Sequence, residues 1–211
     1  MKFKYFNFLV FIQFIWLQTG IDIAKMMDAK GQPNNLKSTM TMVLTNKKGK
    51  SQTSIIKSIS EGGGKKQIIW FLEPKINYGI ALLKIEYDDK PDDMRLWLPA
   101  FKRVNRITTK KKSSSFMKSD LSYEDLYNRN LNKYDFILLR QENLNNVICY
   151  VLESTPNDQK NSGYSKHITW IDKKMLIPIK EESFDKSGKL YKTKEYTYSR
   201  IDTYDILSMI K

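Results

Sequence analysis

The chain has 211 residues, of which 41% are hydrophobic and 28% charged, and its formal net charge at pH 7 is +13. That length suits one domain with a sizeable core, and the composition excludes an intrinsically disordered chain. Thirty of the 36 basic residues are lysines, and arginine, which nucleic-acid interfaces favour, is scarce. We therefore expect no nucleic-acid partner, while attraction to anionic lipid headgroups stays open.

The first twenty residues have the pattern of a secretory signal peptide. Lys2 and Lys4 precede a mostly apolar run from Phe6 to Leu17, which is too short to cross a bilayer as a helix. We predict a signal peptide over 1–20, cleaved near 18–20. The alternatives are an uncleaved anchor and a buried N-terminal strand.

A short amphipathic helix is predicted at the start of the mature chain. Over residues 21–30, Ile23, Met26, Met27 and Lys30 recur at the spacing of one helix face. We expect this helix to cover the apolar face of a sheet.

Strand patterns then follow almost without a break. Apolar and polar residues alternate in segments that are separated by turn residues. The predicted strands span 39–45, 53–59, 67–72, 79–87, 94–98, 102–108, 134–140, 147–154, 164–171, 177–184 and 190–200. Their spacing of roughly 10–15 residues, without long helices between them, favours an antiparallel meander. We predict a mainly β fold, in which a curved antiparallel sheet forms an incomplete, half-open β-barrel with short helices as a lid.

Few residues along the chain carry obvious chemistry. Cys149 is the only cysteine and His167 the only histidine, and each lies in a predicted strand, so a zinc site and a catalytic triad are not expected. The glycines at 62–64 lack phosphate-loop spacing and are typical of a hairpin turn. The acidic segment 88–93 lacks calcium-loop spacing, and we interpret it as an exposed turn. We expect no catalytic residue, metal or cofactor, and therefore no enzyme.

The central loop combines a lysine–serine run with a capped turn. We interpret the run at 110–115 as a mobile surface loop that acts as a gate. Ser122 and Asp125 form a capping-box pattern, which predicts a short helix over 122–127.

Five stretches of the chain carry a resemblance to one family. They are Ser38–Met42, Leu96–Val104, Ser115–Asp125, Cys149–Glu153, and Trp170–Asp172 with Ile177–Pro178. The chain resembles the periplasmic lipoprotein-carrier superfamily (LolA/LolB-like), in the branch of outer membrane lipoprotein-sorting proteins. The resemblance runs from about residue 21 to about residue 201. Relatives continue with further strands beyond the position of Arg200, so we expect either a shortened sheet in this chain or a sequence that is incomplete at its C-terminal end.

The resemblance implies a half-open β-barrel around an apolar cavity, in a single carrier domain over 21–211 located in the periplasm. It implies a lipid or lipoprotein acyl chain as cargo. Relatives in this branch are often found with inner-membrane transporters of the resistance-nodulation type, which are candidate partners. We expect a monomer.

Our hypothesis is a carrier that shields an acyl chain for lipoprotein sorting or lipid transfer. Methionine suits such a cavity because its side chain is flexible and polarizable. The candidate lining residues are Met40, Met42, Leu44, Leu83, Ile85, Leu96 and Leu98, and the candidate lid residues are Phe116, Met117 and Leu121. The alternative is an envelope adaptor that docks on such a transporter and binds no lipid, in which case an exposed apolar patch should dominate.

Overall fold

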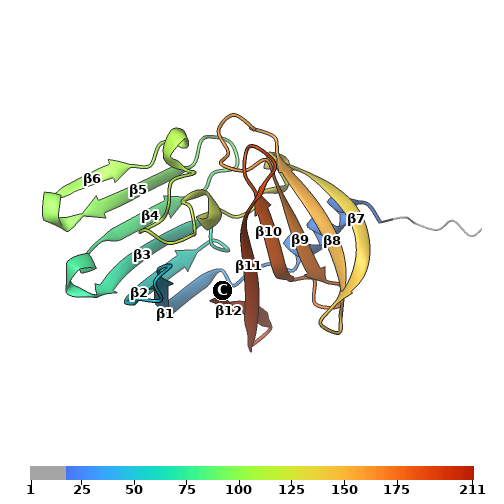
Figure 1. Cartoon of the computed structure of the whole chain (residues 1–211), viewed down its shortest axis with the longest axis horizontal. Coiled ribbons are helices and arrows are strands. Elements are labelled where there is room, and N and C mark those ends of the chain that lie inside the picture. The colour runs from blue at the N-terminus through green and yellow to red at the C-terminus, as the bar shows by residue number, and fades with distance from the viewer. Residues whose placement is uncertain (1–17) are drawn as a thin grey trace, which may run out of the picture.

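Two antiparallel sheets make up most of the described chain, as Figure 1 shows. The computed structural model describes residues 18–211, so the predicted signal peptide lies outside the described residues except for its last three positions. Sheet 1 contains β1 (Asn35–Thr45), β2 (Ser51–Glu61), β3 (Lys66–Glu73), β4 (Ala81–Ile85), β5 (Asp93–Leu98) and β6 (Arg103–Arg106). Sheet 2 contains β7 (Tyr134–Leu144), β8 (Val147–Pro156), β9 (Lys166–Asp172), β10 (Pro178–Phe184), β11 (Leu190–Ile201) and β12 (Tyr204–Ile210).

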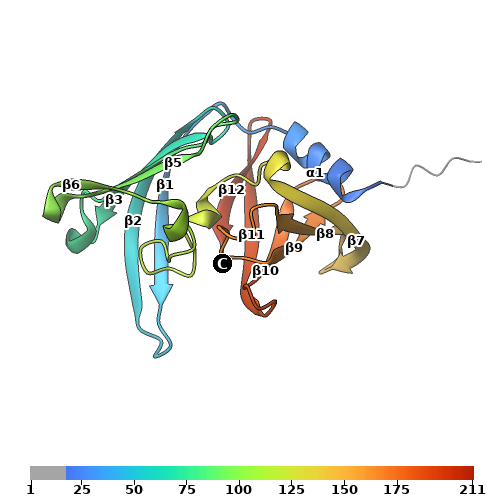
Figure 2. The same ribbon diagram turned by 90° about the horizontal axis from the view of Figure 1, so that it is seen from above.

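The predicted mainly β fold with an open, curved antiparallel architecture is confirmed. Strands that follow one another in the chain pair in both sheets, so each sheet is a meander. Figure 2 shows that the sheets are curved and that α1 lies against sheet 2. The strands form two sheets rather than one, and pairing continues past Arg200 into β12, which the residue pattern did not predict.

The helix α1 (Gly20–Ala29) confirms the predicted helix and begins one residue earlier. The backbone N–H of Asp22 donates to Oγ1 of Thr19 (3.4 Å), and the N–H of Thr19 donates to Oδ2 of Asp22 (3.0 Å). This capping box satisfies donors that the first turn leaves unpaired. None of the described helices is long and apolar enough to span a membrane.

The buried face of α1 differs from the predicted stripe. Ile23 and Ala24 are buried against sheet 2, and Met27 packs beside them. Met26 and Lys30, which the pattern placed on the same face, are exposed. The buried face of α1 is therefore rotated toward Gly20 and Ala24. The reason is that the N-terminal end of the helix lies directly on the β7 backbone at Phe136 and Ile137.

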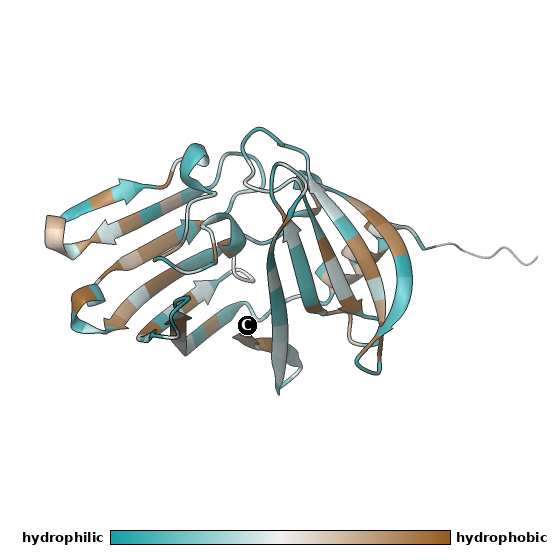
Figure 3. Ribbon diagram, viewed as in Figure 1, coloured by the Kyte–Doolittle hydropathy of each residue, from teal (hydrophilic) through white to brown (hydrophobic). Residues whose placement is uncertain are grey.

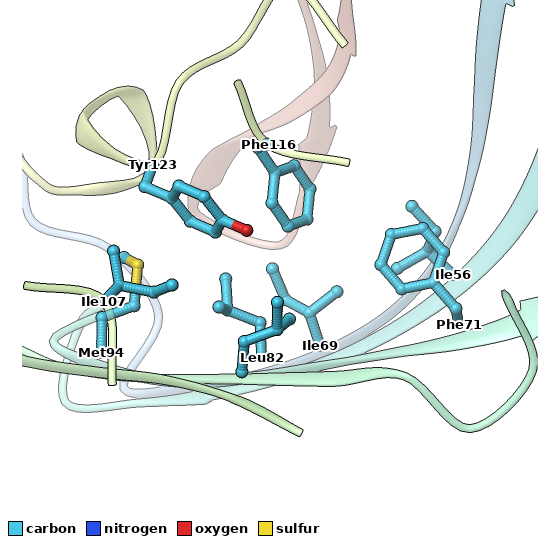
Figure 4. Close-up of a cluster of buried hydrophobic side chains, with 9 residues drawn as sticks. Ile56, Ile69, Phe71, Leu82, Met94, Ile107, Phe116 and Tyr123 are labelled. Atoms are coloured by element: carbon cyan, nitrogen blue, oxygen red, sulfur yellow. The ribbon is translucent and has the colours of Figure 1, made fainter. Parts of the chain in front are cut away.

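Residues 107–133, which we name the strap, connect β6 to β7 and cross the inner face of sheet 1. The strap contains the short 3₁₀ helices η3 (Thr109–Lys111), η4 (Glu124–Leu126) and η5 (Leu131–Lys133). Phe116 and Tyr123 point from the strap into a cluster of apolar side chains on the sheet, as Figure 4 shows. The predicted helix over 122–127 is therefore only the single 3₁₀ turn of η4. Two more 3₁₀ turns, η1 (Lys75–Asn77) and η2 (Pro99–Phe101), lie between strands of sheet 1.

Candidate functional site

A cleft of about 700 Å³ opens between the two sheets, beside α1. This volume lies within the roughly 300–1,000 Å³ that is usual for small-molecule sites. Its apolar wall is made by Ala24, Met27, Leu131, Phe136, Leu152, Ile171, Leu176, Ile177 and Pro178. Its polar rim includes Asp28, Lys30, Gln32, Lys65, Glu86, Asp88, Asn128, Arg129, Asn130, Asn132, Thr203 and Asp205.

The apolar wall arises where α1 crosses sheet 2. Leu152 on β8 and Ile171 on β9 are buried under the helix, and Met27 and Phe136 are half-buried beside them. Half-buried apolar side chains around a hollow still expose area that a ligand could cover. The wall therefore suits a hydrocarbon.

Ion pairs hold the rim together. The ammonium of Lys30 lies 2.6 Å from Oδ2 of Asp205, and the guanidinium of Arg200 lies 3.0 Å from Oδ1 of the same carboxylate. Hydrogen bonds from Lys30 and Arg200 lower the pKa of the Asp205 carboxyl. Across the cleft, Lys65 pairs with Asp88 at 2.7 Å. The Lys30–Asp205 pair joins the end of α1 to β12.

The predicted lining residues lie outside this cleft. Met42, Leu96 and Leu98 pack in the cluster that the strap covers. Met40 is exposed on β1, and Leu44 is half-buried near the end of the same strand. Whether these side chains contact a ligand stays a prediction.

Strand β4 presents to the interior the face opposite to the predicted one. Leu82 and Lys84 are buried toward the strap, whereas Leu83 and Ile85 are half-buried on the outer face of sheet 1. The reason is that Lys84 has partners in the interior: its ammonium lies 2.6 Å from Oε1 of Glu86 and donates to the carbonyl oxygen of Leu126.

The predicted lid residues belong to the strap and rest on sheet 1. Phe116 is buried, with its ring centroid 6.0 Å from that of Phe71 and 5.8 Å from that of Tyr123. Met117 packs against the same cluster, and Leu121 is half-buried. The structure thus brings Phe116 and Met117 together with Leu96 and the other strap-covered side chains, and their role as a movable lid stays a prediction.

Buried charges fasten the strap to sheet 2. The Asp125 carboxylate lies 2.9 Å from the ammonium groups of both Lys192 and Lys194, and it accepts a 2.8 Å hydrogen bond from the Tyr164 hydroxyl. Burial raises the pKa of the Asp125 carboxyl, but Lys194 and Lys192 together lower it well below its usual range. Asp125 also accepts from the backbone N–H of Ser122, and its own N–H donates to Oγ of Ser122, so the predicted reciprocal bonds form. The residue at the cap position of η4 is nevertheless Tyr123, which makes no side-chain cap.

A second buried carboxylate, that of Glu181, continues this network. The guanidinium of Arg129 and the ammonium of Lys194 both lie 2.7 Å from Glu181. Burial raises the pKa of the Glu181 carboxyl. Arg129 and Lys194 lower it by more than burial raises it, so the pKa lies well below its ordinary value. Because removing one member of such a network leaves a buried charge unpaired, the strap is held firmly.

The strap is also tied to sheet 1 through the acidic segment. The Lys133 ammonium lies 2.9 Å from Oδ2 of Asp92, and Lys112 lies 3.7 Å from the same atom. The interpretation of this segment as an exposed turn is therefore wrong for Asp92, whose carboxylate is almost fully covered. Within residues 18–211 no group of acidic, histidine or cysteine side chains could hold a metal ion.

His167 lies in a buried polar cluster on sheet 2. Its Nδ1 atom is 2.9 Å from the Ser183 hydroxyl and 3.5 Å from Oε1 of Glu181. A catalytic triad needs the serine on one ring nitrogen and the acid on the other. In this cluster the Ser183 hydroxyl and the Glu181 carboxylate both face Nδ1 of His167. All three side chains are buried, so we interpret the contacts as structural. Burial, assisted by Arg129, lowers the pKa of His167 to about 3.

Comparison with known proteins identifies the family. A family model described as "Uncharacterized protein" matches residues 63–211. No curated protein matches the chain. An outer membrane lipoprotein-sorting protein domain from Vibrio parahaemolyticus is 35% identical, with a TM-score of 0.86, over 90% of this chain and 83% of that one.

Two further solved structures are similar. A DUF1329 family protein from Desulfovibrio piger is 31% identical, with a TM-score of 0.84, over 91% of this chain and 84% of that one. The LolA superfamily protein NE2245 from Nitrosomonas europaea shares the fold, with 22% identity and a TM-score of 0.69 over 88% of this chain and 81% of that one. The chain therefore shares the fold of the LolA superfamily protein and belongs to the family of outer membrane lipoprotein-sorting proteins.

Proposed function

We propose that this protein is a non-enzymatic periplasmic carrier that holds one acyl chain of a lipid or lipoprotein in the cleft. The observation that carries the proposal is the apolar wall of the cleft under a polar rim, a shape that suits an amphiphile with its hydrocarbon inside and its head at the rim. The likeness to a lipoprotein-sorting domain supports it.

Hydrocarbon burial supplies enough free energy for this task. Each CH₂ group that leaves water contributes about 0.8 kcal/mol. Part of that gain offsets the lost freedom of the chain and the ordering of the side chains it touches. Several buried CH₂ groups therefore give reversible binding, which a carrier needs.

Neighbouring methionines on α1 make a matched test. Met27 lines the cleft, whereas Met26 is exposed and is not among the lining residues. We expect Met27→Asp to weaken binding of a fluorescent fatty acid at least about tenfold, because a carboxylate on the wall must be desolvated by the hydrocarbon. Met26→Asp should bind like the unmodified protein, and fluorescence titration measures both.

The predicted lining residues remain a second location for the cargo. If the strap lifts, Met42 and Leu98 would be uncovered beside the predicted lid residue Phe116. Met42→Ala should then weaken binding of the same probe while Met27→Asp leaves it unchanged. The reverse result would favour the cleft as the place of the hydrocarbon. Unchanged binding in both variants would contradict the carrier proposal.

The adaptor alternative has one observation in its favour. The outer face of sheet 1 exposes Ile59, Leu72, Trp97 and Val104, and such apolar surface can mark a protein contact. An adaptor that docks on an inner-membrane transporter would bind no acyl probe at all. We further propose that residues 1–20 direct export and that the mature carrier is a monomer.

A further inference from the structure

We propose that one end of sheet 1 is a docking surface for an anionic lipid bilayer. This surface, which we name the basic tip, consists of the three turns at 46–50, 74–79 and 99–103. It is separate from the cleft, and its function does not depend on what the cleft holds.

Strand order places the three turns at the same end of sheet 1. In an antiparallel meander successive hairpins close at alternate ends of the sheet. The β1–β2 turn follows the Thr45–Ser51 pair, the β3–β4 turn follows Trp70–Ala81, and the β5–β6 turn follows Leu98–Arg103. All three hairpins therefore close at the same end of the sheet.

Two of the turns lie in contact. A Cβ atom placed on Gly79 would be 3.6 Å from Cγ of Pro99, so the β3–β4 and β5–β6 turns are neighbours. Figure 3 shows hydrophobic segments in these turns, which project at the outer end of sheet 1.

Large apolar side chains protrude from the tip. Ile76 is 84% exposed, Phe101 is 70% exposed and Tyr78 is 66% exposed. None of the three belongs to the strap-covered cluster on the inner face of sheet 1. Protruding aliphatic and aromatic groups of this kind insert at the boundary between headgroups and hydrocarbon.

The charge of the tip selects an anionic partner. The three turns carry Lys47, Lys48, Lys50, Lys75, Lys102 and Arg103, and they contain no acidic residue. Glu73, just before the second turn, is the nearest carboxylate in the sequence. Arg103 lies over the Phe101 ring, 5.8 Å from its centroid, so cation and ring approach the surface together.

A bilayer suits this arrangement better than a folded protein. The cations are mostly lysines, which are flexible point charges without the geometry for specific carboxylate pairing. Lys75, Lys102 and Arg103 lie in the same turns as the protruding Ile76, Tyr78 and Phe101. This arrangement suits insertion into a fluid anionic surface. The opposite end of sheet 1 carries Asp88 and Glu86 at the cleft rim, so docking by the tip leaves the cleft uncovered.

Vesicle sedimentation of the protein purified after export, without the apolar run 6–17 of the proposed signal peptide, tests the proposal. We expect binding to vesicles of phosphatidylcholine with phosphatidylglycerol, much weaker binding to phosphatidylcholine alone, and a loss of binding as salt is raised. The double variant Ile76→Ser with Phe101→Ser should reduce the bound fraction at least about tenfold. Its fold should be unchanged by circular dichroism, because both side chains are largely exposed.

Two controls make the result specific. Ile148→Ser with Leu190→Ser removes exposed apolar groups from sheet 2 and should bind vesicles as the unmodified chain does. Met27→Asp should also leave vesicle binding unchanged, which separates this proposal from the carrier function.

Three results would overturn the proposal. The first is a chain that ignores anionic vesicles. The second is equal loss of binding in the sheet 2 control. The third is self-association that disappears in the Ile76 and Phe101 double variant without any vesicle binding, which would assign the tip to a second copy of the chain.

Discussion

His167 is kept uncharged in the interior of sheet 2. Burial, assisted by Arg129, lowers the pKa of His167 to about 3, while the unfolded chain has an ordinary histidine with a pKa near ~6.5. Between these values the unfolded state binds one more proton than the folded state. The stabilisation is therefore present above about pH 6.5 and is lost as the pH falls toward 3.

We expect the free energy of unfolding to fall by up to about 1.4 kcal/mol per pH unit below pH 6 on this account. His167→Gln, which can still bond to Ser183, should remove most of that slope. Urea unfolding at several pH values between about 5 and 7 measures it, and the window is clean because the chain has a single histidine. An identical slope in both proteins would refute the assignment.

Individual interior charges were the hardest residues to predict. Lys84 sits in an apolar strand, where alternation alone made Leu83 the inward residue. Asp125 was recognised as a cap, but its lysine partner Lys194 lies 69 residues away in the chain. A pattern defines which residues share a face of one element, whereas it does not define which faces meet. The regular spacing of Lys192 and Lys194 on one face of β11 was the available signal.

Helix α1 depends on a close approach at its first residue. A Cβ atom at Gly20 would lie 2.6 Å from backbone atoms of Phe136 and Ile137 on β7. Gly20→Ala should therefore push the helix off sheet 2 and cost about 1–3 kcal/mol of stability, a typical cost of overpacking.

The same displacement should weaken acyl binding, because α1 supplies Met27 to the cleft wall. Thermal unfolding and the fluorescent fatty acid titration give the two readouts. Lys25→Ala, at an exposed position of the helix, should change neither. If Gly20→Ala were as stable as the unmodified chain, the helix would not rest on β7 in the way described.

Strands were the elements that the sequence predicted best. The predicted segments overlap β1 to β11, with bounds that differ by up to four residues, because alternation and turn residues are local signals. β12 was missed because its hairpin turns at Asp202 and Thr203, without the glycine or asparagine that usually marks a two-residue turn. Asp202 adopts the left-handed conformation there, with φ of 51°.

The molecule as a whole separates its apolar surfaces. The strap closes the inner face of sheet 1, α1 and sheet 2 keep an apolar wall at the cleft, and the basic tip lies at the other end of sheet 1. The curved open fold could be predicted from strand spacing and family resemblance. The position of the cleft could not be predicted, because it depends on which side chains of the strap fill the space inside the sheets. Phe116 and Tyr123 fill the part that sheet 1 lines.

The central claim is that the cleft beside α1 holds a hydrocarbon chain. The most direct test is mass spectrometry of lipids extracted from the full chain after purification from the cell envelope, with Met27→Asp and Met26→Asp purified in parallel. We predict an acylated molecule enriched over background in the unmodified protein and in Met26→Asp, and depleted at least about tenfold in Met27→Asp. An unmodified protein with no acylated molecule above background, or one that Met27→Asp retains in full, would contradict the claim.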